Sequence, residues 1–242
     1  MCGIAGFITS DYHSDIDGAV SRMVSVLEHR GPDDHGTWVD QQHGIALGHR
    51  RLSVLDLSPA GKQPMLSASG RWVIAYNGEV YNHLDLRRRL ETQQAAPSWR
   101  GHSDTETILA CMDAWGVERT LRSSVGMFAF ALWDREERVL VLARDRLGEK
   151  PLYYGWQGDS FLFGSELKAL QQHASFNARI DRGALSLLLR HNCVPAPYSI
   201  YEGIQKLRPG HLVRIPHASH GARPSEPYWS MNEIVEDGLR NP

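Results

Sequence analysis

Two apolar runs lie in the second half of the chain, MFAFALW at residues 127–133 and VLVLA at 139–143, separated by the polar residues DREER at 134–138. Two short apolar runs around a polar turn predict a β-hairpin. Neither run alternates between apolar and polar residues, so neither face of the predicted sheet meets water. The hairpin therefore belongs to a sheet that is covered on both sides.

The flanking sequence supplies the layers that such a sheet needs. We expect further strands at 4–8, 36–39, 45–48, 72–76, 152–156 and 161–163. Apolar residues between Ile16 and Leu27 recur at helical spacing, which predicts an amphipathic helix that the Arg30-Gly31-Pro32-Asp33 segment ends. Further helices are expected at 84–90 and 105–115, and after Glu166 and Asp181. Ser103 and Glu106 predict a capping box.

Strands buried on both faces and amphipathic helices together predict an α+β fold. Two stacked, mainly antiparallel sheets with helices on both outer faces, a four-layer αββα sandwich, would bury every apolar face. Beyond Pro216 the composition becomes polar and rich in histidine and proline. We therefore expect one domain over residues 1–215 and a linker over residues 216–242.

Composition narrows the classes of function. The 242 residues carry a net charge of −2, which favours neither nucleic acid nor an anionic membrane as a partner. No apolar stretch approaches the roughly 18 residues of a membrane helix, and no signal peptide is recognisable, so we expect a cytoplasmic protein. Three cysteines provide neither a disulfide framework nor the spacing of a metal site.

The N-terminus carries a candidate nucleophile. Removal of Met1 before the small residue Cys2 would leave a thiol and a free α-amine on one residue. Such an amine has an ordinary pKa of about 7.7–8.0, so it can act as the base that activates the thiol. By itself, Cys2 is more simply interpreted as a cysteine that happens to follow the start codon.

Several further motifs accompany Cys2 in a fixed order. They are MCGIAG at 1–6, HRGPDD at 29–34, GHRRLS at 48–53, YNGEVYN at 76–82, SDTE at 103–106, GMFAFA at 126–131 and RDRLGEKPLYY at 144–154. Each is weak alone, but together they cover nearly the whole chain. The sequence resembles the class II glutamine amidotransferases, the N-terminal-nucleophile family, and the 30–33 and 150–154 motifs resemble its asparagine-synthetase branch.

The resemblance implies an N-terminal-nucleophile hydrolase fold and an activity that converts glutamine to glutamate and ammonia. In this branch an ATP-dependent synthetase domain, with default acceptor aspartate, follows a segment like residues 202–211. The synthetase's Ser-Gly-Gly-x-Asp-Ser loop is absent here. We therefore expect glutamine and a synthetase domain or subunit as partners, while a homodimer stays open. No cofactor is expected for this chain, since ATP and Mg²⁺ are implied only for the absent domain.

The resemblance also implies roles for particular residues. Cys2 is the catalytic nucleophile, and the Asn77 side chain with the Gly78 N–H forms the oxyanion site. The glutamine α-carboxylate would bind Arg51. Its α-ammonium would bind Asp104, with Glu79 nearby. Four of these residues have a simpler alternative: Asn77-Gly78 is a common hairpin turn, Arg51 could be a surface charge, and Asp104 could be an acid that favours a helix N-terminus.

One departure and two competing hypotheses remain. Residues 99–102, Trp-Arg-Gly-His, stand where the family usually has an aromatic residue followed by small or hydroxyl residues, which predicts a different pocket rim. A stand-alone glutaminase subunit that serves a separate amidating partner is one alternative to a synthetase fragment. A catalytically silent docking module is the other, and the intact set of site residues argues against it.

Overall fold

The fold was analysed in a computed structural model, which describes residues 1–54, 56–217 and 224–241. The first part of the chain contains β1 (Gly3–Thr9), α1 (Ile16–Ser25), β2 (Asp34–Asp40), β3 (Ile45–Arg51), β4 (Met65–Leu66), β5 (Trp72–Val80), α2 (His83–Thr92), α3 (Asp104–Trp115) and α4 (Val117–Ser123). The second part contains β6 (Gly126–Asp134), β7 (Val139–Arg144), β8 (Tyr153–Gln157), β9 (Ser160–Gly164), α5 (Leu167–Leu170), α6 (Arg182–His191), β10 (Ile204–Lys206), β11 (His211–Pro216), β12 (Glu226–Pro227) and α7 (Met231–Arg240).

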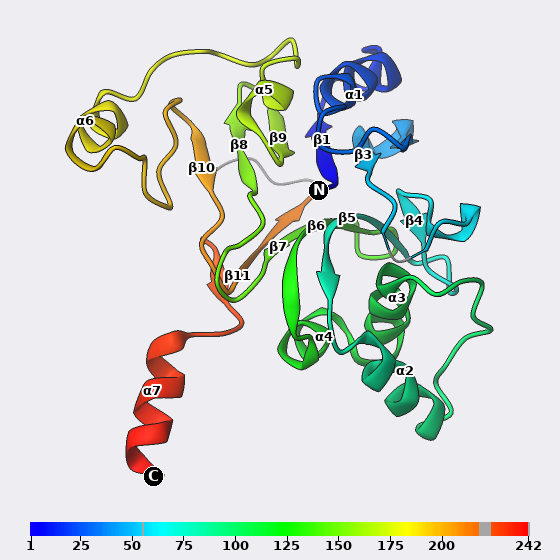
Figure 1. The fold of residues 1–242 in the computed structure, drawn as a ribbon. Helices are drawn as coiled ribbons and strands as arrows, with labels where there is room; N and C mark the ends of the chain where they lie inside the picture. Colours follow the sequence, from blue (N-terminus) through cyan, green and yellow to red (C-terminus); the bar gives the residue numbers. More distant parts are fainter. Residues whose placement is uncertain (55, 218–223, 242) are drawn as a thin grey trace.

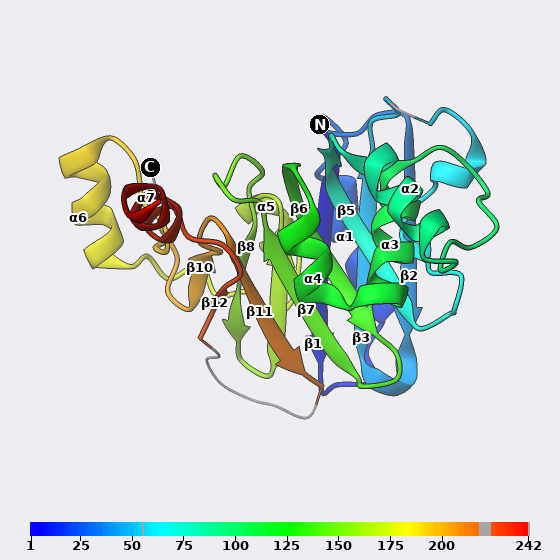
Figure 2. The same cartoon turned by 90° about the horizontal axis from the view of Figure 1, so that it is seen from below.

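The strands form two six-stranded antiparallel sheets. The first has the order β10-β8-β9-β1-β3-β2 and the second β12-β11-β7-β6-β5-β4. Helices α1 and α5 cover the outer face of the first sheet, while α2, α3 and α4 cover the second (Figures 1 and 2). The predicted αββα sandwich is confirmed.

Three buried apolar clusters fill the three spaces between these four layers, and β6 explains how. Its alanines at 129 and 131, with Trp133, face the other sheet, whereas Phe128, Phe130 and Leu132 face the helices. Because side chains alternate along a strand, β6 contributes residues to both clusters. Both of its faces are therefore apolar, and its sequence is a continuous apolar run. The predicted hairpin of β6 and β7 is confirmed, with Trp133 opposite Leu140.

Two sequence predictions differ from the structure in detail. Helix α1 ends at Ser25, before Leu27, which is still fully buried and whose N–H bonds to the Val24 carbonyl in a turn. Only half of the capping box forms: Ser103 Oγ accepts the Glu106 N–H, but the Glu106 carboxylate accepts the N–H groups of residues 100 and 101 instead of reaching back to Ser103.

The segment after Pro216 contains more structure than a bare linker requires. Strand β12 pairs with β11, and Tyr228 is buried with its hydroxyl donating to the Arg144 carbonyl. Helix α7 extends away from the sandwich and buries none of its residues (Figure 1). Part of the predicted 216–242 linker, residues 218–223 and 242, lies outside the described residues, and the boundary at 215 stays a prediction.

The apolar interface between the sheets predicts how much a cavity there would lower the stability of the fold. Leu142 is fully buried between the sheets, so Leu142→Ala should lower the free energy of unfolding by about 2–5 kcal/mol. Urea denaturation at constant m measures this change. Leu84→Ala, on the exposed side of α2, is the matched control and should change stability by no more than about 0.5 kcal/mol. Equal losses in both variants would contradict the proposed layering.

Candidate active site

All six residues singled out in the sequence line one pocket at an end of the sandwich, whose empty volume, with the solvent at its open mouth included, is about 770 Å³. The six are Cys2, Arg51, Asn77, Gly78, Glu79 and Asp104. They come from the position just before β1, the end of β3, the end of β5 and the first turn of α3. The pocket therefore spans both sheets and one helix N-terminus, which no single segment could supply.

Cys2 is half-buried at the point where β1 enters the first sheet. Its Sγ lies 3.7 Å from the Leu52 carbonyl oxygen and accepts the Leu52 N–H at 3.4 Å. Burial raises the pKa of the thiol, although the Leu52 N–H, the positive N-terminus and Arg51 oppose that effect. A thiol in this setting needs a base before it can act as a nucleophile.

Arg30 fixes the backbone of Cys2, a role that the sequence did not reveal. Its Nε donates to the Cys2 carbonyl oxygen at 2.9 Å, and its Nη1 donates to Glu166 at 2.8 Å. Burial raises the pKa of Glu166, but hydrogen bonds from Arg30, His29 and Lys168 outweigh it and lower the value to about 2. The only sequence signal was the presence of Arg30 within the HRGPDD motif.

The end of β5 presents an edge that lacks a neighbouring strand. Strand β4 pairs only with residues 73 and 74 of β5. Beyond them, side chains instead of a strand form hydrogen bonds with the β5 backbone. Gln63 Oε1 accepts the Tyr76 N–H at 2.7 Å, and Asp104 Oδ2 accepts the Val80 N–H at 2.9 Å. Because backbone groups alternate along a strand, the Gly78 N–H points to the same edge, between these two bonds.

Glycine is required at position 78 for a packing reason. A Cβ there would lie 2.3 Å from the Met127 carbonyl oxygen and 2.6 Å from Phe128 Cα. Neighbouring Asn77 is 1% exposed, and its Nδ2 has no hydrogen-bond partner within the described chain. Both residues lie inside a strand, so the interpretation of Asn77-Gly78 as a hairpin turn is wrong.

Arg51 and Asp104 line the pocket, and both are charged side chains that are buried. Arg51 is 8% exposed and donates from Nη1 to the Ser58 carbonyl at 3.2 Å and from Nη2 to the Asp56 carbonyl. Asp104 is 5% exposed, and burial raises its pKa against the hydrogen bonds from the Val80 N–H and the Tyr76 hydroxyl. Arg51 is therefore not a surface charge, and Asp104 does more than begin α3.

His49 supports the same edge of β5 from the opposite sheet. It is fully buried, and its Nε2 lies 2.9 Å from the Tyr76 carbonyl oxygen, so Nε2 carries the proton. Nδ1 has no hydrogen-bond partner among the described residues. Burial lowers the pKa of His49 from 6.5 to about 4, which keeps the ring neutral. The Tyr76 backbone is thus held by Gln63 at its N–H and by His49 at its carbonyl.

Comparison with known proteins identifies the family of this chain. The family of the glutamine amidotransferase domain matches residues 1–229. This chain belongs to that family. It is a class II, N-terminal-nucleophile glutamine amidotransferase domain, and it is therefore an enzyme domain.

Relatives of this amidotransferase domain are longer proteins. Asparagine synthetase [glutamine-hydrolyzing] 3 of Bacillus subtilis is 40% identical over 88% of this chain and 34% of its own length. A putative asparagine synthetase 2 of Methanocaldococcus jannaschii is 36% identical over 86% of this chain and 42% of its own. Glutamine phosphoribosylpyrophosphate amidotransferase from B. subtilis shares the fold with a TM-score of 0.66 at 20% identity, over 96% of this chain and 50% of that one.

Two kinds of feature are absent from the described residues of this amidotransferase domain. Within ranges 1–54, 56–217 and 224–241, no three His, Cys, Asp or Glu side chains gather closely enough to hold a metal ion. Over the same ranges, no helix is long and apolar enough to cross a membrane.

The buried His49 predicts how stability depends on pH. Its folded pKa lies below the ordinary 6.5, so the native state binds fewer protons than the unfolded state. This contribution to stability is fully present above about pH 6.5 and is lost as pH falls towards about 4, by about 2 kcal/mol between about pH 7.5 and about pH 5. Urea denaturation at both pH values measures it, and His49→Asn should remove this part of the slope.

An exposed histidine provides the control for this pH dependence. His191→Asn, at the exposed end of α6, should keep the wild-type slope. A His49→Asn protein whose stability falls as steeply with acid as the wild type would show that His49 is not the group responsible.

Proposed function

We propose that this domain hydrolyses L-glutamine to glutamate and ammonia through a γ-glutamyl thioester on Cys2. The observation that carries the proposal is a buried donor without a partner in the described chain, Asn77 Nδ2, which shares a pocket with the Cys2 thiol and the opposite charges of Arg51 and Asp104. A free amino acid brings one carboxylate and one ammonium, and this pocket offers one partner for each.

The first half of the reaction needs a base and an oxyanion site. Once Met1 is removed, the Cys2 α-amine takes the thiol proton, and Sγ attacks the side-chain carbonyl carbon of glutamine. Asn77 Nδ2 and the Gly78 N–H stabilise the resulting oxyanion. When the C–N bond breaks, the proton passes to the leaving nitrogen, and ammonia departs. Water then attacks the thioester, releases glutamate and restores the thiol.

The clamp for the amino-acid end uses charges that are already buried. The Arg51 guanidinium has five N–H donors. The carbonyl oxygens of residues 56 and 58 each accept one hydrogen bond, from Nη2 and Nη1. The remaining N–H groups can donate to the substrate carboxylate. Asp104 and Glu79 would bind the substrate ammonium. Since Arg51 and Asp104 have lost most of their water in the folded protein, little further desolvation opposes binding.

The ammonia released by this domain would be used at an acceptor site on a partner domain or subunit. The domain spans only 34% and 42% of two asparagine synthetase relatives, which supports a synthetase domain or subunit as its partner. We propose ATP-dependent amidation as the fate of the ammonia, with aspartate as the default acceptor. ATP and Mg²⁺ would then serve that partner, and the glutaminase itself would need no cofactor. A separate partner that amidates another carboxylate is the alternative.

The nucleophile gives the first test of this function. Purified chain should convert glutamine to equal amounts of glutamate and ammonia without ATP or Mg²⁺, and Cys2→Ala should abolish the reaction because no nucleophile remains. Glutamate and ammonia are measured together, and circular dichroism confirms folding. A Cys2→Ala protein with about a tenth of wild-type turnover would contradict the mechanism.

Processing of Met1 is the companion control. In the structure Met1 is attached, so the Cys2 nitrogen belongs to a peptide bond and cannot act as the base. Intact mass of the active protein should show Met1 removed, and a sample that retains Met1 should be inactive. Full activity with Met1 attached would exclude the α-amine as the base.

Asn77 gives a second, independent prediction. Asn77→Ala should lower kcat about 10²–10³-fold with KM within about twofold, because the lost donor acts on charge that develops only in the transition state. Steady-state glutaminase kinetics measure both constants. Asn177→Ala, at an exposed position outside the pocket, is the matched control and should keep wild-type kinetics. A rise in KM alone would assign Asn77 to substrate binding instead.

A further inference from the structure

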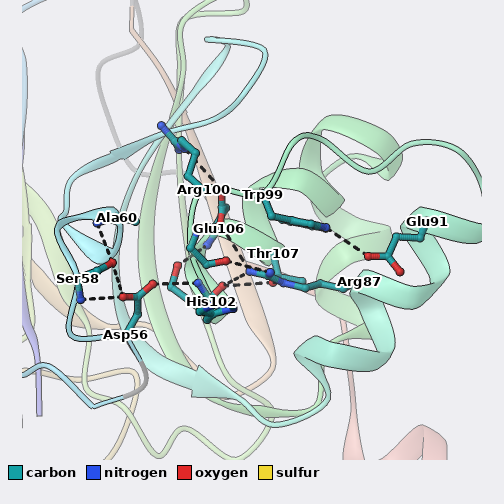
Figure 3. Close-up of polar contacts among 12 residues, drawn as sticks. Asp56, Ser58, Ala60, Arg87, Glu91, Trp99, Arg100, His102, Glu106 and Thr107 are labelled. Atoms are coloured by element: carbon teal, nitrogen blue, oxygen red, sulfur yellow. Dashed lines mark hydrogen bonds and ion pairs between the residues drawn. The ribbon is translucent and has the colours of Figure 1, made fainter.

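The two charged ends of the pocket are supported by separate segments of chain, and one buried carboxylate joins them. Residues 56–58 follow Arg51, and residues 99–103 precede Asp104. Asp56 is 8% exposed and contacts both segments (Figure 3). We propose that Asp56 is a positioning residue that sets the separation between Arg51 and Asp104, an inference that rests on the glutaminase function proposed above.

On the Arg51 side, Asp56 fixes the carbonyl groups that hold the guanidinium. Its Oδ1 accepts the Ser58 N–H at 2.8 Å and the Ser58 hydroxyl at 2.6 Å. This turn presents the carbonyl oxygens of residues 56 and 58 to the Arg51 side chain. The side chain of Asp56 therefore orients Arg51 through the backbone, without touching the guanidinium by a hydrogen bond of its own.

On the Asp104 side, Asp56 holds the backbone just before α3. Its Oδ2 accepts the His102 N–H at 2.9 Å. The opposite side of this backbone is held by an ion pair: the Glu106 carboxylate accepts the Gly101 N–H at 3.1 Å, and Arg87 donates to the Gly101 carbonyl at 3.0 Å (Figure 3). The segment before Asp104 is thus fixed between Asp56 and the Arg87–Glu106 pair.

Two residues of the rim sequence Trp-Arg-Gly-His at 99–102, Gly101 and Trp99, make this contact possible. A Cβ at Gly101 would lie 2.5 Å from Asp56 Oδ2 and 2.9 Å from Ala60 Cβ, so any side chain there would displace the carboxylate. Trp99 packs under Arg87, with Cζ 4.0 Å from the ring centre, and donates to Glu91 at 3.3 Å. Gly101 therefore supplies the space for the Asp56 bridge, and Trp99 supports Arg87 on the other side of this backbone.

Chemistry explains why this position needs a carboxylate. Both oxygens of Asp56 accept hydrogen bonds, and the bonds from the Ser58 hydroxyl and the His102 N–H hold its pKa below the ordinary value. An asparagine would place an amide N–H₂ against one of these donors, and one end of the bridge would be lost. Asp56→Asn keeps the shape of the side chain while removing that connection.

Covalent labelling of Cys2 separates positioning from general damage. 6-Diazo-5-oxo-L-norleucine carries the α-ammonium and α-carboxylate of glutamine, whereas iodoacetamide carries neither. In the processed full chain, Asp56→Asn should lower the labelling rate of Cys2 by the first reagent about tenfold or more, and leave labelling by iodoacetamide within about twofold. Peptide mass spectrometry follows Cys2 apart from Cys111 and Cys193.

A second variant reaches the same contact from the other side. Gly101→Ala should reproduce the selective loss, and the double variant should be no worse than the single variants because both break one contact. Asp85→Asn, an exposed acid on α2, is the matched control and should behave as wild type. Similar losses with both reagents in Asp56→Asn, or none with either, would overturn the bridge.

The same experiment distinguishes failure of the bridge from failure of the function. Wild-type chain that reacts with iodoacetamide but not with the glutamine analogue would show that the pocket does not bind glutamine, and both proposals would fall. Wild-type chain that reacts with both reagents, beside an Asp56→Asn variant that does the same, would overturn the bridge alone.

Discussion

The burial of β1 in the middle of the first sheet is the constraint on which the site depends. The strand pairs on both sides, with β3 and β9, and Ser165 exchanges hydrogen bonds with Ile4 through both its side chain and its N–H. A chain terminus is ordinarily mobile, and a reactive group placed there would lose its geometry. Because β1 starts at Gly3, only Met1 and Cys2 extend beyond it. This pairing gives Cys2, the residue just before the strand, a fixed position.

A second consequence concerns the two sheets, which contribute different chemistry to one end of the sandwich. The first sheet brings the thiol and, through β3, the guanidinium of Arg51. The second brings the unpaired edge of β5, whose N–H groups face the same space. His49 joins the two, because it belongs to β3 and bonds to the β5 backbone at Tyr76. The apolar interface between the sheets therefore sets distances between polar groups that lie beyond its end.

Much of this could be predicted from the sequence, for physical reasons that differ between elements. The β6–β7 hairpin was predictable because both faces are buried and every residue of the run is apolar. Helix α4, the two-residue strands β4 and β12, and strands β10 and β11 were not predicted, since short elements depend on partners more than on their own pattern. Arg30 and Asp56 were missed as supports of the site because each acts through a backbone contact across 28 or 46 positions, which a motif cannot display.

The end of β5 that lacks a neighbouring strand also bears on how the chain could pair with another chain while it folds. A row of free backbone groups on a strand invites another chain to add a strand of its own, which is a common start of aggregation. Here the side chains of Gln63, His49 and Asp104 bond to that row. Among the described residues this leaves the space beside Gly78 open, which is too short for a foreign strand to pair. The side chains around this edge therefore shield the β5 backbone from pairing with another chain, in addition to shaping the pocket.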